Sequence, residues 1–249
     1  MASLWVDGGL ASASHAPLNH PRVMLISHSH KFIFVHCMKT AGRSIEHALG
    51  SYAEPQPTKH WSSSWRKNLP AALGPLNRLP LLRRLVQYGV HTSALEARAS
   101  IGQARWDSYY TFAIVRNPWD RLVSRYHHLS TRPHVRWHKE VVRLGSFAHY
   151  VRWEMEIARK RMHQCSDLCD RNGKVLVKFV GRFERLEADF AVITRELGLN
   201  VKLPHRNPAT QPKADYRSYY DDELRDLVGR FCAQDCETFG YHFDGFIDR

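Results

Sequence analysis

The sequence predicts an α/β fold, a single domain in which helices flank a central parallel sheet. Two observations predict it. Short runs of apolar, β-branched and aromatic residues are followed three times by a polar loop and then by a helical pattern. The 249 residues, 43% of them hydrophobic, are enough to bury the core of one such domain. Because parallel sheets bind ligands at the carboxyl ends of their strands, we expect functional residues in the polar loops.

The strands of this sheet are expected at 31–36, 109–115 and 174–180, and the helices that follow them at 44–49, 119–129 and 183–197. Pro118 suits the first turn of the second helix, and Gly198 ends the third. A basic helical stretch covers 134–163. A last helix begins at the acidic turn 221–223 and ends before Gly240.

The domain is expected to span residues 30–249, preceded by a loose N-terminal arm. Residues 1–29 mix Ser, Ala, Gly, His and Pro, a composition typical of a poorly ordered terminus. Residues 53–80 contain five prolines and predict irregular structure inside the domain. Long irregular segments in a compact domain often have a functional role.

The net charge is strongly positive. Lysine and arginine total 36 against 24 acidic residues, which gives a net charge of +12 and a pI near 9.7. Such a surface attracts anionic ligands. The sequence contains no zinc-finger spacing, basic-helix heptads or RNP-type aromatic motif, so we expect no nucleic-acid partner.

The cysteines and the hydropathy pattern indicate a cytoplasmic protein. Five cysteines are an odd number in a chain too large to need disulfides, which favours a reducing compartment. Two pairs, Cys165/Cys169 and Cys232/Cys236, could form a zinc site with His163, but neither has the usual knuckle spacing, and we expect no metal. No signal peptide and no run of about 20 apolar residues is present, so no membrane span is expected.

The first loop, residues 36–44 (HCMKTAGRS), joins the first predicted strand to its helix. Backbone N–H groups at such a junction converge on an anion, and the helix dipole adds to the attraction. Gly42 permits close approach, Lys39 adds a mobile charge, and Thr40 and Ser44 add hydroxyls. The loop is P-loop-like without being a Walker motif, in which lysine directly precedes the hydroxyl residue. A tight turn with a solvated lysine is the alternative interpretation.

The second loop, residues 116–124 (RNPWDRLVS), follows the second predicted strand. Arg116 and Ser124 are eight residues apart, so the serine lies about two helical turns along. From there its hydroxyl can meet an anion held by the arginine at the strand end. Two anion sites in one fold predict a ligand with separated phosphates.

These loops resemble those of the sulfotransferases that use 3′-phosphoadenosine 5′-phosphosulfate (PAPS), most closely the carbohydrate-type branch, sulfotransferase family 2. The first loop resembles the family's 5′-phosphosulfate loop, the second its 3′-phosphate element, and residues 180–190 its C-terminal segment, in family order across residues 31–243. The resemblance implies that PAPS is bound by Lys39, Thr40, Ala41, Gly42, Arg43, Ser44, Arg116, Ser124 and Arg182. This chain has Met38 and Arg43 where relatives usually have proline and threonine.

The resemblance implies transfer of a sulfuryl group from PAPS to an acceptor hydroxyl, with adenosine 3′,5′-bisphosphate (PAP) as product and a carbohydrate as the favoured acceptor. Lys39 is expected to stabilise the leaving oxygen and His91 to act as base, with His36, His60 and Glu46 as alternatives.

Other roles stay open at this point. Arg182 and Glu184 could instead form a structural ion pair, residues 132–161 are the candidate acceptor-recognition segment, and the tyrosines near residue 220 are expected to pack. Two rival functions remain, a P-loop nucleotide kinase and a non-catalytic protein that binds anionic glycans or nucleotides.

Overall fold

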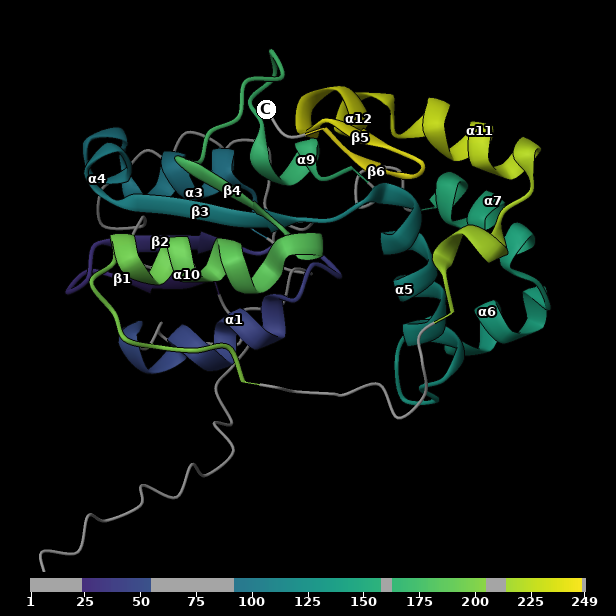
Figure 1. Ribbon diagram of the computed structural model, residues 1–249, viewed down its shortest axis with the longest axis horizontal. Coiled ribbons are helices and arrows are strands. Elements are labelled where there is room, and N and C mark those ends of the chain that lie inside the picture. Colours follow the sequence, from purple (N-terminus) through teal and green to yellow (C-terminus); the bar gives the residue numbers. More distant parts are fainter. Residues whose placement is uncertain (1–23, 55–91, 158–162, 205–213, 248–249) are drawn as a thin grey trace, which may run out of the picture.

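The computed structural model describes residues 24–54, 92–157, 163–204 and 214–247. Its centre is a four-stranded sheet in the order β1-β2-β3-β4 (Figure 1). The strands are β1 (Leu25–Ser27), β2 (Phe32–Val35), β3 (Tyr110–Val115) and β4 (Phe179–Arg182). β2, β3 and β4 run parallel, and β1 pairs antiparallel with β2. The predicted α/β fold with a central, mostly parallel sheet is confirmed.

Helices cover both faces of the sheet. On one face lie α1 (Gly42–Leu49) and α10 (Leu186–Glu196), and on the other α3 (Ala94–Ile101), α4 (Gln103–Ser108) and α9 (Cys165–Leu168) (Figure 1). Side chains alternate between the two faces, so that Phe32 and Phe34 pack toward α1 while Ile33 and Val35 join the opposite core. Burial on both faces explains why the strands are apolar throughout.

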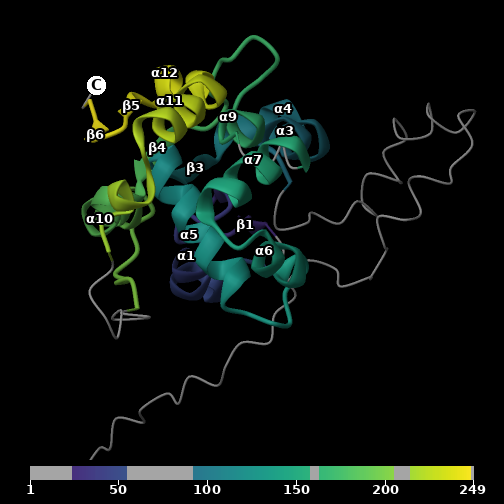
Figure 2. The same cartoon turned by 90° about the vertical axis from the view of Figure 1, so that its right-hand side faces the viewer.

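A second group of helices packs beside the sheet. It consists of α5 (Pro118–Ser130), α6 (His138–Leu144), α7 (Phe147–Ile157) and α11 (Asp222–Phe231), and Figure 2 shows α6 and α7 beside α5. Trp119 and Leu122 of α5 share a buried cluster with Tyr150 of α7 and Leu224 of α11. The tyrosines of the short 3₁₀ helix η5 (Tyr216–Tyr219) and Tyr220 pack against this cluster, as the sequence predicts.

The C-terminal segment returns to the sheet. After α11 the chain forms α12 (Ala233–Phe239) and a two-stranded hairpin of β5 (Tyr241–His242) and β6 (Gly245–Phe246). The shorter 3₁₀ helices η1 (Gly50–Tyr52) and η4 (Phe183–Arg185) lie after α1 and β4. Gly240 ends α12 with φ 68°, in the left-handed region that glycine adopts without strain.

Most predicted elements are present, with shifted ends. The first two predicted helices occur as α1 and α5, and Pro118 occupies the first turn of α5. The third strand begins at Phe179 rather than at residue 174, because the preceding residues make only an isolated bridge between Cys169 and Val175. Gly145, at φ 73°, divides the basic stretch into α6 and α7. A break at Cys232 likewise divides the last predicted helix.

The edge strand β1 lies within the stretch that the sequence assigns to the N-terminal arm. The turn after it is anchored by Glu54, whose carboxylate accepts the N–H groups of His28 at 2.6 Å and Ser29 at 2.9 Å. The Ser27 hydroxyl donates to the carbonyl of Tyr52 at 2.6 Å. These contacts with residues after α1 fix a strand of three residues, which is too short for a periodicity signal.

Candidate active site

The first loop has an unusual backbone. Lys39 and Ala41 adopt left-handed conformations, with φ 68° and 67°, although neither is glycine. Such residues cost about 1–3 kcal/mol each and concentrate at ligand sites. The N–H groups of Ser44 and Ile45 bond to the carbonyl of Ala41 at 2.8 and 3.3 Å. In the described part of the chain, no acceptor meets the N–H groups of Ala41, Gly42 and Arg43, and α1 has no side-chain cap. The loop therefore presents backbone donors and a helix N-terminus to an anion.

The hydroxyl residues of the first loop differ in their surroundings. Thr40 is fully buried, and its hydroxyl donates to the carbonyl of Cys37 at 2.8 Å. This bond closes the loop on itself. Ser44 is half-buried in the first turn of α1, and Arg43 beside it is exposed. The contacts of Thr40, Arg43 and Ser44 with a phosphate stay predictions.

Gly42 is required by the packing of His36 beneath the loop. A Cβ at position 42 would lie 2.0 Å from Nε2 of His36, closer than any real contact. The His36 ring stacks on Phe34, and its Nδ1 lies 2.9 Å from Oε1 of Glu46. His36 is only 9% exposed, so a structural role fits it better than that of a base.

The second loop begins where β3 ends, and the structure brings it against the first. Arg116 is buried, and its Nε and Nη2 donate to Oδ2 of Asp120 at 2.8 and 2.6 Å. Its Nη1 donates to the carbonyl of Lys39 at 3.1 Å. The guanidinium also lies over the Phe183 ring, 3.9 Å from its centroid. One guanidinium group therefore joins the two loops.

Lys39 lies among positive charges. Burial, followed by the charges of the nearby Arg116, Arg132, Arg125 and Arg43, together lower the pKa of its ammonium group from 10.5 to about 8. Like charges disfavour the protonated form because each repels an added proton. A bound anion would offset this repulsion. The cluster therefore has the electrostatics of an anion-binding site.

Ser124 lies where the sequence places it, two turns along α5 and partly exposed. Asn117 caps this helix by accepting the N–H of Trp119 at 3.0 Å. The backbone N–H of Asn117 donates to Oε1 of Glu184 at 2.7 Å. The start of α5 is therefore fixed by bonds to its neighbours, and the phosphate contact of Ser124 stays a prediction.

Arg182 lies at the end of β4, where Val115 of β3 is its register partner. Its Nη1 donates to the carbonyl of Phe239 at 2.7 Å, and the guanidinium lies 4.5 Å from the centroid of Phe246. These contacts hold the C-terminal hairpin against the sheet. The proposed contact of Arg182 with PAPS stays a prediction.

Glu184 and Arg182 do not pair with each other within the described ranges. The second carboxylate oxygen of Glu184 accepts the hydroxyl of Tyr241 at 2.9 Å, while the first accepts the Asn117 N–H. Glu184 therefore ties the second loop to the hairpin. This is a structural role, but it does not involve the ion pair considered from the sequence.

Arg125 and Glu154 form a buried pair that the sequence motifs miss. The Nε of Arg125 lies 2.7 Å from Oε1 of Glu154, whose side chain is fully buried. The Nη1 of Arg125 contacts the sulfur of Met38, the residue directly before Lys39. Buried ion pairs are costly and are weak evidence of stability alone. The sequence does contain one sign of this pair: Glu154 is a carboxylate that shares the buried face of α7 with Tyr150 and Met155.

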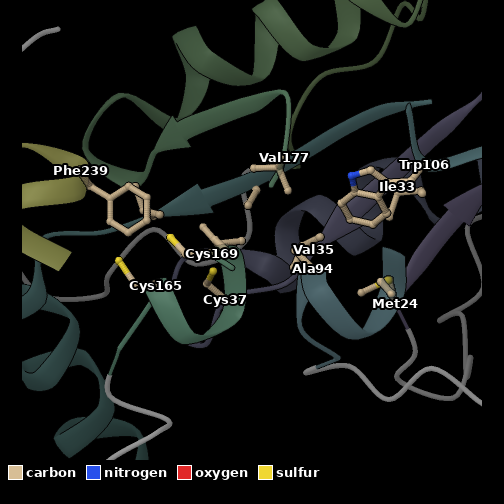
Figure 3. Close-up of a cluster of buried hydrophobic side chains, with 14 of the residues drawn as sticks. Met24, Ile33, Val35, Cys37, Ala94, Trp106, Cys165, Cys169, Val177 and Phe239 are labelled. Carbon is tan, nitrogen blue, oxygen red and sulfur yellow. The ribbon is translucent and has the colours of Figure 1, made fainter. Parts of the chain in front are cut away.

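His91 and His60 lie outside the described residues, so the predicted base has no structural description. The five cysteines form no disulfide, and Cys37, Cys165 and Cys169 belong to the apolar cluster that also contains Phe239 (Figure 3). Among the described residues, no three His, Cys, Asp or Glu side chains are arranged to hold a metal ion. No helix in the described ranges is long and apolar enough to cross a bilayer.

Comparisons with known proteins identify the family of this chain. An uncharacterized protein from Archaeoglobus fulgidus is 33% identical over 109 residues, which is 44% of this chain and 84% of that relative. No solved structure gives a significant match. Residues 22–242 match the model of the Sulfotransferase family, and this match includes both loops. The match covers most of the chain, and the protein therefore belongs to the sulfotransferase family.

Proposed function

We propose that the protein transfers a sulfuryl group from PAPS to an acceptor hydroxyl, with the two loops binding one nucleotide. The observation that carries the proposal is the bond from Nη1 of Arg116 to the carbonyl of Lys39. It brings a backbone anion cradle and a buried guanidinium together, as a nucleotide with separated 5′ and 3′ phosphates requires. Family membership supports sulfuryl transfer as the reaction.

The described residues fit such a donor. The first loop offers N–H groups from Ala41, Gly42 and Arg43 to the 5′-phosphosulfate. Arg116 and Ser124 would hold the 3′-phosphate. Lys39 is mainly protonated at neutral pH, because its pKa is about 8. Its ammonium group can stabilise the charge that develops on the leaving oxygen.

In the transfer, the bond between the sulfuryl sulfur and the 5′-phosphate oxygen breaks, and a bond from the acceptor oxygen to sulfur forms. The acceptor proton moves to a base, for which we propose His91, and PAP leaves. The fixed loops hold donor and acceptor in line, so that positioning lowers the barrier. The aligned donors need no rearrangement when the charge develops.

We propose a carbohydrate as the acceptor. The described part of the predicted acceptor segment, residues 132–157, contains aromatic and cationic groups, and the charge of Arg132 acts on Lys39. The guanidinium of Arg136 lies 4.4 Å from the centroid of Trp137, and Trp137 meets Trp153 edge to face at 5.7 Å. Aromatic faces stack on sugar rings, and arginines pair with anionic groups on them.

The absence of disulfides among the five cysteines supports the cytoplasm as the proposed compartment.

A transfer assay tests the proposed function. The protein is incubated with sulfur-labelled PAPS and a panel of glycans, and labelled product and PAP are measured. The expected result is label on a glycan with one PAP formed per transfer. Magnesium-dependent hydrolysis or transfer from ATP, without use of PAPS, would contradict the proposal and support a nucleotide kinase.

A further inference from the structure

The backbone of Arg116 is held by a side chain from a distant part of the chain. Oε1 of Gln164 accepts the N–H of Arg116 at 2.8 Å, and Nε2 of Gln164 donates to the carbonyl of Arg116 at 2.9 Å. The two residues are 48 positions apart, and Gln164 is fully buried. A single amide therefore satisfies both backbone polar groups of the strand-end arginine.

Gln164 is itself fixed by a buried carboxylate. Asp235 of α12 accepts the backbone N–H of Gln164 at 2.8 Å and that of Cys165 at 2.9 Å. Asp235 is also fully buried. A continuous series of bonds thus runs from α12 through the start of α9 to the end of β3. Buried polar networks in which every member is bonded rigidify their surroundings.

The amide takes the place of a neighbouring strand. The ladder of β3 with β4 ends at Val115, and Arg116 is the next residue. Its buried backbone groups still need partners, which the amide provides. Fixing both groups also sets the direction in which the side chain leaves the backbone. That direction must let the guanidinium reach Asp120 and the carbonyl of Lys39 at once.

We infer that Gln164 is a positioning residue for recognition of the donor's 3′-phosphate and acts through Arg116. The inference rests on the proposed function. Gln164 is fully buried and bonded to backbone, so it acts without touching the ligand. Because Arg116 is assigned to the 3′-phosphate, loss of the amide should weaken binding of nucleotides that carry this phosphate and spare those that lack it.

The test measures nucleotide selectivity by calorimetry at pH 7, with PAP and AMP as the probes. Gln164→Met keeps the length of the side chain and removes both bonds, while Gln164→Glu keeps an acceptor for the Arg116 N–H and loses the donor. The wild-type protein should bind PAP more tightly than AMP. Each variant should lose about tenfold in PAP affinity, because small misplacements of a binding group are costly, and AMP affinity should change little.

Thr111→Val is the matched control. Thr111 is fully buried on the same strand at its opposite end, and its hydroxyl accepts the N–H of Lys178 at 2.9 Å. The substitution removes a buried bond of β3 far along the strand from Arg116. It should lower the unfolding temperature and leave the ratio of PAP to AMP affinity unchanged.

Two results would overturn the inference. One is an unchanged affinity ratio in both Gln164 variants, and the other is an equal loss for PAP and AMP, which a purely structural role produces. If Gln164→Met does not fold, Gln164→Glu provides the same comparison. A wild-type protein that binds neither nucleotide would overturn the proposed function itself, which separates the two failures.

Discussion

The first and second loops lie at the same edge of the sheet but are built differently. In the first loop, two non-glycine residues adopt left-handed conformations, and three backbone N–H groups have no acceptor within the described residues. In the second, the backbone of Arg116 and Asn117 is bonded by side chains of Gln164 and Glu184. One loop leaves donors available to a ligand, while the other uses most of its donors internally.

This difference predicts which substitutions impair function alone and which also lower the stability of the fold. Groups that are strained or crowded by like charge are stabilised only by a ligand, so replacing them should impair function with little loss of stability. Groups in a bonded network contribute to both, so replacing them should impair function and stability together.

Arg116→Ala should have the largest effect, because it changes both properties. It removes the group assigned to the 3′-phosphate, and transfer should become undetectable. It also removes an arginine paired with the buried Asp120, and breaking a buried pair costs about 3 kcal/mol of unfolding free energy. Turnover of PAPS and urea-induced unfolding measure the two effects.

The control for Arg116 is Arg217→Ala, which removes an exposed arginine paired with Asp215 and Asp244. Surface pairs contribute about 0–1 kcal/mol, so this variant should keep both stability and turnover. Near wild-type turnover of Arg116→Ala would contradict the assignment of the second loop.

Lys39→Ala should abolish transfer without destabilising the fold. The ammonium group that stabilises the leaving oxygen is lost, for which we expect a reduction in kcat of at least about 100-fold. Stability should be unchanged or slightly higher, because a partly buried cation is removed from among arginines. Steady-state kinetics and thermal unfolding test this, with the exposed Lys202→Ala as control. Full turnover in Lys39→Ala would disprove the assigned role.

Gly42→Ala should destabilise the protein by about 1–3 kcal/mol, because the new methyl group collides with the His36 ring. Gly50→Ala is the matched control at the end of the same helix, where a Cβ meets nothing within 4 Å. It should be neutral or stabilising. Urea-induced unfolding compares the two. Equal free energies of unfolding for the two variants would mean that His36 does not pack beneath the loop.

The affinity for PAP should depend on pH through Lys39. In the protein without ligand, the pKa of the Lys39 ammonium group is about 8. A bound anion raises this pKa, so binding is coupled to protonation of Lys39. With respect to Lys39, affinity should be nearly constant below about pH 7, fall about twofold by pH 8 and fall about tenfold by pH 9. Lys39→Arg, which stays charged, should show no such fall. A wild-type affinity that is flat from pH 7 to pH 9 would contradict the coupling.

The local features of the site could be predicted from the sequence. Strand, polar loop and helix follow one another directly, so periodicity and the glycine and proline positions located both loops. Because parallel strands end at one edge of a sheet, the sequence predicts that Arg116 lies near the first loop. It does not predict the bond from Arg116 to the carbonyl of Lys39.

The supporting contacts could not be predicted. Gln164 meets Arg116 across 48 residues, and Glu154 meets Arg125 across 29. Neither pair has a spacing that a local pattern reveals, because both depend on how helices pack beside the sheet. The strand β1 was missed for a similar reason, since contacts with Tyr52 and Glu54, which follow later in the chain, hold it in place.

We propose that the two loops form one site for a nucleotide with a 5′-phosphate and a 3′-phosphate. A calorimetric titration of the wild-type protein with PAP and with AMP tests it most directly. We expect one PAP bound per chain, with an affinity at least about tenfold above that for AMP. Equal affinities for PAP and AMP, or no binding of PAP, would contradict it.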